Sequence, residues 1–301
     1  MLLFALAGWV FWPVLIELNE RWLTDPHYSH CAIVPLAALF VFWARRHSIP
    51  SPRRSAWLGL IIVGVGLGLN YFGEITFFGF VQAFGFIFVL LGIVASLHGW
   101  RTAAWALPPM FLLAFAIPLP YRIHTALAEP LQRAVAFGVT NLLQLRGRPA
   151  ISMGHVVAVD DHRVSVVDAC CGLGMLFVFV FVAATIAVLS RRPVIDRILL
   201  CLVAPIVGLL ANILRVSVTL EARLLGYSDD VVTTVHDVGG YLLAPVALAA
   251  LLMFLLTVAI VFPNSKPADE PLQIAFQLGV SDGHDQVAPV RRRSPGPSSA
   301  R

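Results

Sequence analysis

The sequence predicts an all-α fold, a polytopic transmembrane helix bundle of about eight spans. The chain has 301 residues, of which 58% are hydrophobic and 13% charged, and its mean hydropathy is +0.83. A soluble domain has a far more polar composition. Apolar stretches close to the roughly 20 residues that a helix needs to cross a bilayer recur along the chain. Both observations indicate an integral membrane protein.

Composition also argues against several other classes. The net charge is +4, but the basic residues are scattered between apolar runs and form no stripe that would bind nucleic acid. Four cysteines are too few and too irregularly spaced for a disulfide scaffold or a pair of zinc knuckles. We therefore expect no nucleic-acid partner, no metal and no cofactor.

The predicted spans occupy a domain from residue 1 to residue 263. They cover residues 2–17, 31–44, 56–74, 76–97, 103–119, 172–190, 196–215 and 240–262. The first stretch lacks the basic segment of a signal peptide, so we interpret it as a retained span. Residues 264–301 are rich in proline, serine and charge, which predicts a disordered cytoplasmic tail.

Arginine positions predict the orientation, because short cytoplasmic loops are enriched in basic residues. The loops that would be cytoplasmic contain Arg45, Arg46, Arg53, Arg54, Arg101, Arg191, Arg192 and Arg197. Segments 18–30, 120–171 and 216–239 then face outward. We predict a multi-pass protein of the inner (plasma) membrane whose chemistry lies on the periplasmic side.

The segment 120–171 contains two further predicted elements. Apolar residues recur at helical spacing within 121–147, with polar residues on the other faces, which predicts a helix lying in the membrane interface. The stretch HVVAVDDHRVSVVDA, from His155 to Ala169, alternates apolar and polar residues. That alternation predicts a small outer hairpin just before Cys170.

Three reactive side chains stand at predicted outer ends of spans: Cys170, Arg215 and His236. A thiol at a helix N-terminus is activated by the helix dipole, which favours the thiolate. A histidine exchanges protons readily, and an arginine holds a developing oxyanion without losing its own proton. The topology brings the three to one membrane depth, so they form a candidate nucleophilic site.

Neighbouring residues support this interpretation, and each has a structural alternative. Asn212 shares a helix face with Arg215, and Gly172 leaves room for a substrate backbone. Arg215 can instead snorkel to the interface, and Asp168 can serve only as a helix cap. Cys170 can pair with Cys171 or with Cys31 in a disulfide, or act as a small apolar residue.

At these residues the chain resembles the exosortase and archaeosortase family. DACCGL, from Asp168 to Leu173, resembles the family's cysteine signature. NILRV, from Asn212 to Val216, resembles its N-x-x-R element, and HDVGG, from His236 to Gly240, its H-x-x-x-G element. DPHYSHC, from Asp25 to Cys31, is similar to an upstream family segment. The resemblance covers roughly residues 20–245.

The resemblance implies a membrane-embedded, sortase-like cysteine transpeptidase or protease. Such enzymes cut PEP-CTERM-like C-terminal sorting signals of membrane-anchored substrate proteins and pass them to a cell-surface acceptor. By this resemblance Cys170 is the nucleophile, with Arg215 and His236 as partners and Gly240 in support. Cys171 stands where the family has serine, so a register shift would make Cys171 the attacking thiol. A candidate substrate groove involves Asp25, Tyr28, Ser29 and His30.

Two functions of other classes compete with this prediction. One is a non-enzymatic membrane component of extracellular polysaccharide export or assembly, which would need no thiol. The other is a small-solute transporter, for which charged residues would lie at the centres of spans. The predicted spans carry almost no charge at their centres, and the polar residues gather at one face. This distribution favours surface chemistry over transport.

Overall fold

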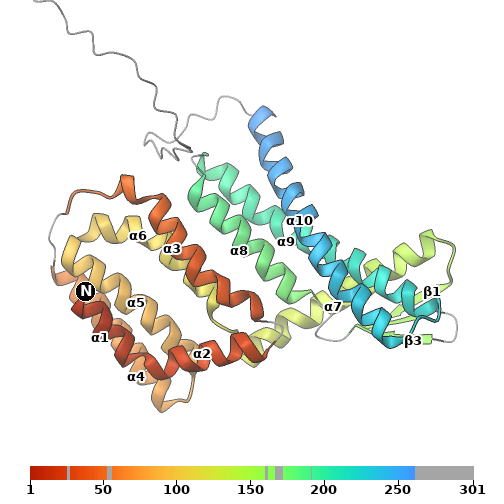
Figure 1. Cartoon of the computed structure of the whole chain (residues 1–301), viewed down its shortest axis with the longest axis horizontal. Coiled ribbons are helices and arrows are strands. Elements are labelled where there is room, and N and C mark those ends of the chain that lie inside the picture. The colour runs from red at the N-terminus through yellow and green to blue at the C-terminus, as the bar shows by residue number, and fades with distance from the viewer. Residues whose placement is uncertain (26–27, 53–55, 160–161, 167–171, 191, 262–301) are drawn as a thin grey trace, which may run out of the picture.

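A computed structural model describes residues 1–25, 28–52, 56–159, 162–166, 172–190 and 192–261 (Figure 1). The predicted tail, 264–301, lies outside these residues. The helices are α1 (Leu2–Val10), α2 (Trp12–Thr24), α3 (Val34–Ala44), α4 (Ala56–Ile75), α5 (Gly79–His98), α6 (Trp100–Leu112), α7 (Tyr121–Leu145), α8 (Leu173–Leu189), α9 (Val194–Leu224) and α10 (Asp229–Val261). Short 3-10 helices are η1 (Ser29–Ile33), η2 (Arg46–Ser48) and η3 (Leu113–Ala116).

Among the described residues, four helices are long and apolar enough to cross a membrane, or up to six if two bent pairs each count as one span. The four are α4, α5, α9 and α10, while α3 and α8 are shorter apolar helices. The described residues thus form a largely helical membrane protein, as the composition predicts. The total of eight spans remains a prediction.

The first predicted span, 2–17, is wrong as a single straight helix. The chain breaks at Phe11, and α1 and α2 meet at an angle of 67°. Pro13 stands in the first turn of α2, where its missing N–H costs nothing, so the proline begins a new helix there. Hydropathy averages over such a break and does not detect it.

Helices α4 and α5 form a tightly packed hairpin. Glycines on both helices lie directly against the partner backbone: Gly66 contacts Gly85, and Gly92 contacts Val63. Membrane helices are not driven together by the hydrophobic effect, so small residues that allow close backbone approach favour their association.

Helix α7 turns away from the preceding helix by 82° and has a buried apolar face, as a helix lying in the interface would. Three antiparallel strands follow it in the order β1 (Ala150–Met153), β2 (Val156–Val159) and β3 (His162–Ser165). The predicted hairpin residues form β2 and β3, and the sequence analysis missed β1. The strand β3 lies at one edge of this sheet, which Figure 1 places at one end of the molecule.

Helices α9 and α10 are longer than the predicted spans. At 1.5 Å per residue, the 31 residues of α9 extend about 46 Å, which exceeds the roughly 30 Å of a hydrocarbon core. The predicted ends of spans at 215 and 240 are wrong as helix ends, because both helices continue to a turn near Gly226. Segment 216–239 is therefore mostly a helical hairpin and not a loop.

A hydrophobic cluster explains this continuation. Its buried residues come from α7, the sheet and the end of α9: Val135, Ala136, Val139, Leu143, Ala150, Val157, Val159, Val166, Val216 and Leu220. Val216 and Leu220 are one helical turn apart and both face this cluster. The cluster holds α7, the sheet and the extension of α9 together beside the long helices.

Candidate active site

The start of α8 lies directly against α9. Gly172 precedes the helix with a left-handed backbone (φ 78°), and a side chain there would place its Cβ 2.5 Å from Asn212 Nδ2. Asn212 itself is fully buried. Only glycine fits both the backbone conformation and the available space. The N-terminal end of α8 is thus fixed against the helix face that carries the N-x-x-R element.

Arg215 lies along α10 through the two glycines of the HDVGG stretch. A Cβ on Gly239 would be 3.4 Å from the Arg215 Cγ, and a Cβ on Gly240 would be 3.2 Å from Nη1. The aliphatic stem and the guanidinium therefore both pass close to the α10 backbone. These glycines bring the second and third sequence elements together.

His236 precedes Gly240 by four residues, so it lies one helical turn, about 5.4 Å along the axis, from the glycine beside the guanidinium. Its side chain is 22% exposed, and Nδ1 lies 3.2 Å from Oδ1 of Asp237. When Nδ1–H donates to this carboxylate, Nε2 is left as the proton acceptor. The sequence analysis did not single out Asp237, although it directly follows His236 in the quoted HDVGG stretch.

A groove with a volume of about 320 Å³ runs between β3 and the α9–α10 hairpin. Its lining is largely apolar, and His236 is one of its polar side chains. It is lined by Val157, Val164, Ser165, Val166, Val216, Thr219, Leu220, Arg223, Val232, Thr233 and His236. Arg223, at the end of α9, pairs with Asp229 at 2.9 Å.

The predicted nucleophile Cys170, its neighbour Cys171 and Asp168 lie outside the described residues. The chain on either side is described. Val166 lies in the same cluster as Val216, and Gly172 lies against Asn212. The N-cap position of α8 is Gly172. Whether Asp168 caps this helix, the structural alternative raised by the sequence, concerns a residue outside the described ones.

The upstream groove candidates lie apart from the groove at β3. Tyr28 and His30 line a separate cavity of about 130 Å³ with Phe115 and Phe177. Burial raises the pKa of the Tyr28 hydroxyl above its ordinary value. The Asp25 carbonyl accepts a hydrogen bond from the Tyr28 N–H at 3.0 Å. Ser29 begins η1. Their role in binding substrate remains a prediction.

Cys31 is a free thiol that is almost fully buried. Its Sγ donates a hydrogen bond to the Phe115 carbonyl at 3.3 Å. The disulfide between Cys31 and the Cys170–Cys171 pair, one of the alternatives raised by the sequence, is therefore not formed in this structure. Among the described residues, no group of three His, Cys, Asp or Glu side chains could hold a metal ion.

This fold and site define a polytopic helical membrane protein in which the residue before α8 contacts α9, and α9 contacts α10: Gly172 lies against Asn212, and Arg215 lies against Gly239 and Gly240. The chain matches the family of transmembrane exosortases (Exosortase_EpsH) over residues 22–255. The chain therefore belongs to the exosortase family, as the resemblance in its motifs predicts. Neither the curated proteins nor the solved structures give a match to it.

Proposed function

We propose that this protein is a membrane cysteine transpeptidase that cleaves C-terminal sorting signals of surface proteins through a thioester on Cys170. One observation carries the proposal: Gly172 lies against Asn212, and Arg215 lies against Gly240. The three sequence elements of the family signature thus meet in space. Membership of the exosortase family supports the same chemistry.

Covalent geometry limits the position of the thiol. Two peptide units separate Cys170 from Gly172, and two units span at most about 7 Å. The proposal places the Cys170 sulfur within reach of Asn212 and Arg215, which this short connection allows. A nucleophile, a guanidinium and an imidazole brought together in this way would meet the first geometric requirement for acyl transfer.

The proposed reaction has two steps, in which each proton is accounted for. In the first, His236 Nε2 takes the thiol proton and the sulfur attacks the scissile carbonyl, while Arg215 stabilises the oxyanion. The protonated His236 then gives its proton to the leaving amine as the C–N bond breaks, which leaves a thioester. In the second step an acceptor nucleophile attacks the thioester, and its proton returns through His236 to the Cys170 sulfur.

Asp237 acts in this scheme as a positioning residue. Its carboxylate accepts the Nδ1–H of His236 and selects the tautomer whose Nε2 is free to take a proton. It also stabilises the imidazolium between the two proton transfers. Asp237 is largely exposed, so water screens part of this interaction.

The groove beside β3 is the proposed binding site for the residues next to the scissile bond. The Val166 N–H donates to the His155 carbonyl, and Ser165 pairs with Val156 in the next position of the register. Hydrogen-bonded and non-hydrogen-bonded pairs alternate along an antiparallel ladder, so the backbone groups of Ser165 point to the open edge. An extended peptide can add there as a further strand. Arg223 favours an acidic side chain in that peptide.

We further propose that the site faces the periplasm and that the protein lies in the inner membrane. Arg45 and Arg197, from two predicted cytoplasmic loops, are near one another, and burial together with the charge of Arg197 lowers the pKa of Arg45. Helix α8 separates these loops from the site. The positive-inside rule then places the site on the opposite, outer side.

Co-expression with candidate substrates tests the proposed reaction. The substrates would end in a short motif, one transmembrane helix and a basic tail. The Cys170→Ala variant should leave them uncut, while Cys171→Ala should still process them. A covalent substrate adduct should be trapped on the parent, and none should form when its thiols are alkylated before the substrate is added.

Two outcomes would contradict this assignment. Processing by Cys170→Ala together with its loss in Cys171→Ala would make Cys171 the nucleophile. A protein that supports surface assembly equally well without either thiol would instead be a non-enzymatic component of polysaccharide export.

A further inference from the structure

Two adjoining cavities that differ in polarity lie in the N-terminal half of the chain, and the proposed reaction uses neither. One, the polar cavity, has the charged side chains of Glu17, Arg21 and Glu74 among apolar residues; its volume is about 500 Å³, and it is lined by α2, the α4–α5 turn and the segment before α7. The other is almost wholly apolar, with a volume of about 480 Å³, and is lined by α1, α2, α3, α5, α6 and η3. Leu18 and Ile117 line both cavities. A polar and an apolar compartment that share walls fit an amphiphile.

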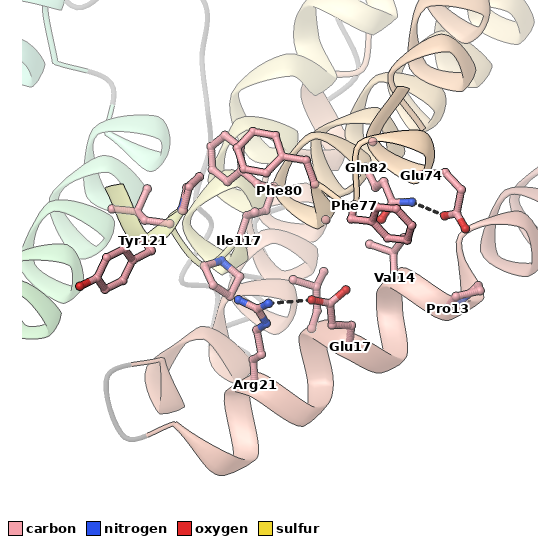
Figure 2. A pocket seen from close by; sticks show the side chains of 17 residues that line it. Pro13, Val14, Glu17, Arg21, Glu74, Phe77, Phe80, Gln82, Ile117 and Tyr121 are labelled. Atoms are coloured by element: carbon pink, nitrogen blue, oxygen red, sulfur yellow. Dashed lines mark hydrogen bonds and ion pairs between the residues drawn. The ribbon is translucent and has the colours of Figure 1, made fainter. Parts of the chain in front are cut away.

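Two polar pairs line the polar cavity (Figure 2). Arg21 donates to Glu17 at 2.8 Å, and both side chains are about half exposed. Gln82, which is buried, donates to Glu74 at 2.5 Å. The formal charge of this lining is −1, from two carboxylates and one guanidinium. A ligand that carries both a cation and an anion matches it, with the cation toward the carboxylates and the anion toward Arg21.

The position of Glu17 is set by a glycine. A Cβ on Gly79 would lie 3.1 Å from the Glu17 Oε2, so the carboxylate lies directly over the start of α5. In Figure 2 the Glu17–Arg21 pair and the Glu74–Gln82 pair stand apart, on different elements. Both pairs line the same cavity, so a headgroup bound there faces groups of both.

The apolar cavity is suited to an alkyl chain and is too small for a helix. Two turns of helix with side chains, about 10–12 Å in diameter, occupy roughly 1,000 Å³, about twice the volume of the cavity. Its walls include Phe4, Ala38, Ala83 and Leu90, from three different helices. Trp22 and Ala116 also line the apolar cavity, and the Trp22 indole N–H donates to the Ala116 carbonyl at 2.8 Å.

We propose that the two cavities together bind one glycerophospholipid with a protonated primary-amine headgroup. The ammonium donates hydrogen bonds to Glu17 and Glu74, Arg21 binds the phosphate, and an acyl chain fills the apolar cavity. A quaternary ammonium has no N–H to donate, and an anionic headgroup without an amine meets a net negative lining. The site therefore selects a primary-amine headgroup over both. This inference does not depend on the proposed peptidase chemistry.

Lipid retention by the purified full chain tests the proposal. Native mass spectrometry after titration with phosphatidylethanolamine, phosphatidylcholine or phosphatidylglycerol of identical acyl chains would count the lipids retained. The parent should retain one ethanolamine lipid with at least about tenfold preference over the other two. The double variant Glu17→Gln with Glu74→Gln should lose this preference.

Glu129→Gln is the matched control. Glu129 is an exposed carboxylate four residues before Arg133, as Glu17 is before Arg21, and it lines none of the described cavities. This variant should retain the ethanolamine lipid as the parent does. Ala38→Phe fills the apolar cavity and should reduce the retention of all three lipids. Its fold is checked by gel filtration and circular dichroism.

Equal retention of the three lipids by the parent would overturn the proposal, since that result indicates unselective filling by bilayer lipid. Preference for the glycerol headgroup would also overturn it. So would an unchanged ethanolamine preference in the double glutamate variant, because the headgroup would then bind elsewhere.

Discussion

The position of Arg215 shows how much the absence of a side chain on a neighbouring helix can decide. Its guanidinium lies beside α10 because positions 239 and 240 are both glycine. Glycine in a helix interior costs about 0.5–1 kcal/mol relative to alanine. The two successive glycines at this helix contact are explained by the close approach of Arg215 to the α10 backbone that they allow.

Gly240→Ala should therefore separate activity from stability. The new Cβ would lie 3.2 Å from Nη1, so the flexible guanidinium must shift by a few tenths of an ångström while the helix itself is strengthened. We expect processing of a sorting-signal substrate to fall about tenfold, with no loss of thermal stability. Gly239→Ala, whose Cβ makes an ordinary contact with the Arg215 stem, is the control and should stay within about twofold. Equal rates in the two variants would contradict this role of Gly240.

Asp237 gives a second prediction at the scale of one residue. Asp237→Asn keeps the size of the side chain but removes the charge beside His236 Nδ1. We expect kcat to fall about tenfold or more with KM nearly unchanged, because an orienting group acts on proton transfer and not on substrate binding. Asp230→Asn, an exposed acidic residue in the first turn of the same helix, is the control. A change in KM alone would show that Asp237 does not act through the histidine.

At the scale of the element, β3 contributes through its backbone. It is an edge strand of a small sheet that packs on α7. Its residues line the groove that also contains His236. An exposed strand edge presents unpaired N–H and C=O groups and is a ready template for another strand. In the proposed function, this element recognises a peptide through its backbone, whatever the side chains of that peptide are.

Ser165→Pro tests the edge directly. Proline removes the N–H that the register points outward, and proline is tolerated at edge positions of this kind. We expect KM for the substrate to rise about tenfold, as one main-chain hydrogen bond to an extended peptide is lost. Ser165→Ala keeps the N–H and removes only the hydroxyl, so it should resemble the parent. Equal effects of the two substitutions would assign the contribution to the side chain.

At the scale of the whole molecule, burial and the proposed orientation predict which thiols an external reagent reaches. Cys31 is nearly fully buried and Cys201 is partly buried within the helix bundle. If the site faces outward, a membrane-impermeant maleimide added to spheroplasts should label a Cys31→Ala, Cys201→Ala double variant. Labelling should disappear when Cys170 and Cys171 are also replaced.

A cysteine placed in the opposite loop completes this experiment. In a variant without native cysteines, Ser51→Cys lies in the predicted cytoplasmic loop between α3 and α4 and should be labelled only after the membrane is permeabilised. The reverse pattern, with Ser51→Cys labelled from outside, would invert the topology.

The sequence by itself determined the membrane class and the family, and it supplied the residues that we propose for the reaction. Composition is a sum over the chain, and the motifs around Cys170, Arg215 and His236 are local, so both can be read without coordinates. The match to the exosortase family over residues 22–255 confirms the family prediction.

Only the tertiary structure decided where the helices end and what surrounds the site. Hydropathy falls after Arg215, yet α9 continues because Val216 and Leu220 bury their side chains against α7 and the sheet. The groove along β3 and the contact of Gly172 with Asn212 likewise depend on neighbours in space. Burial by residues far away in the chain leaves no local pattern, and for that physical reason the sequence could not reveal them.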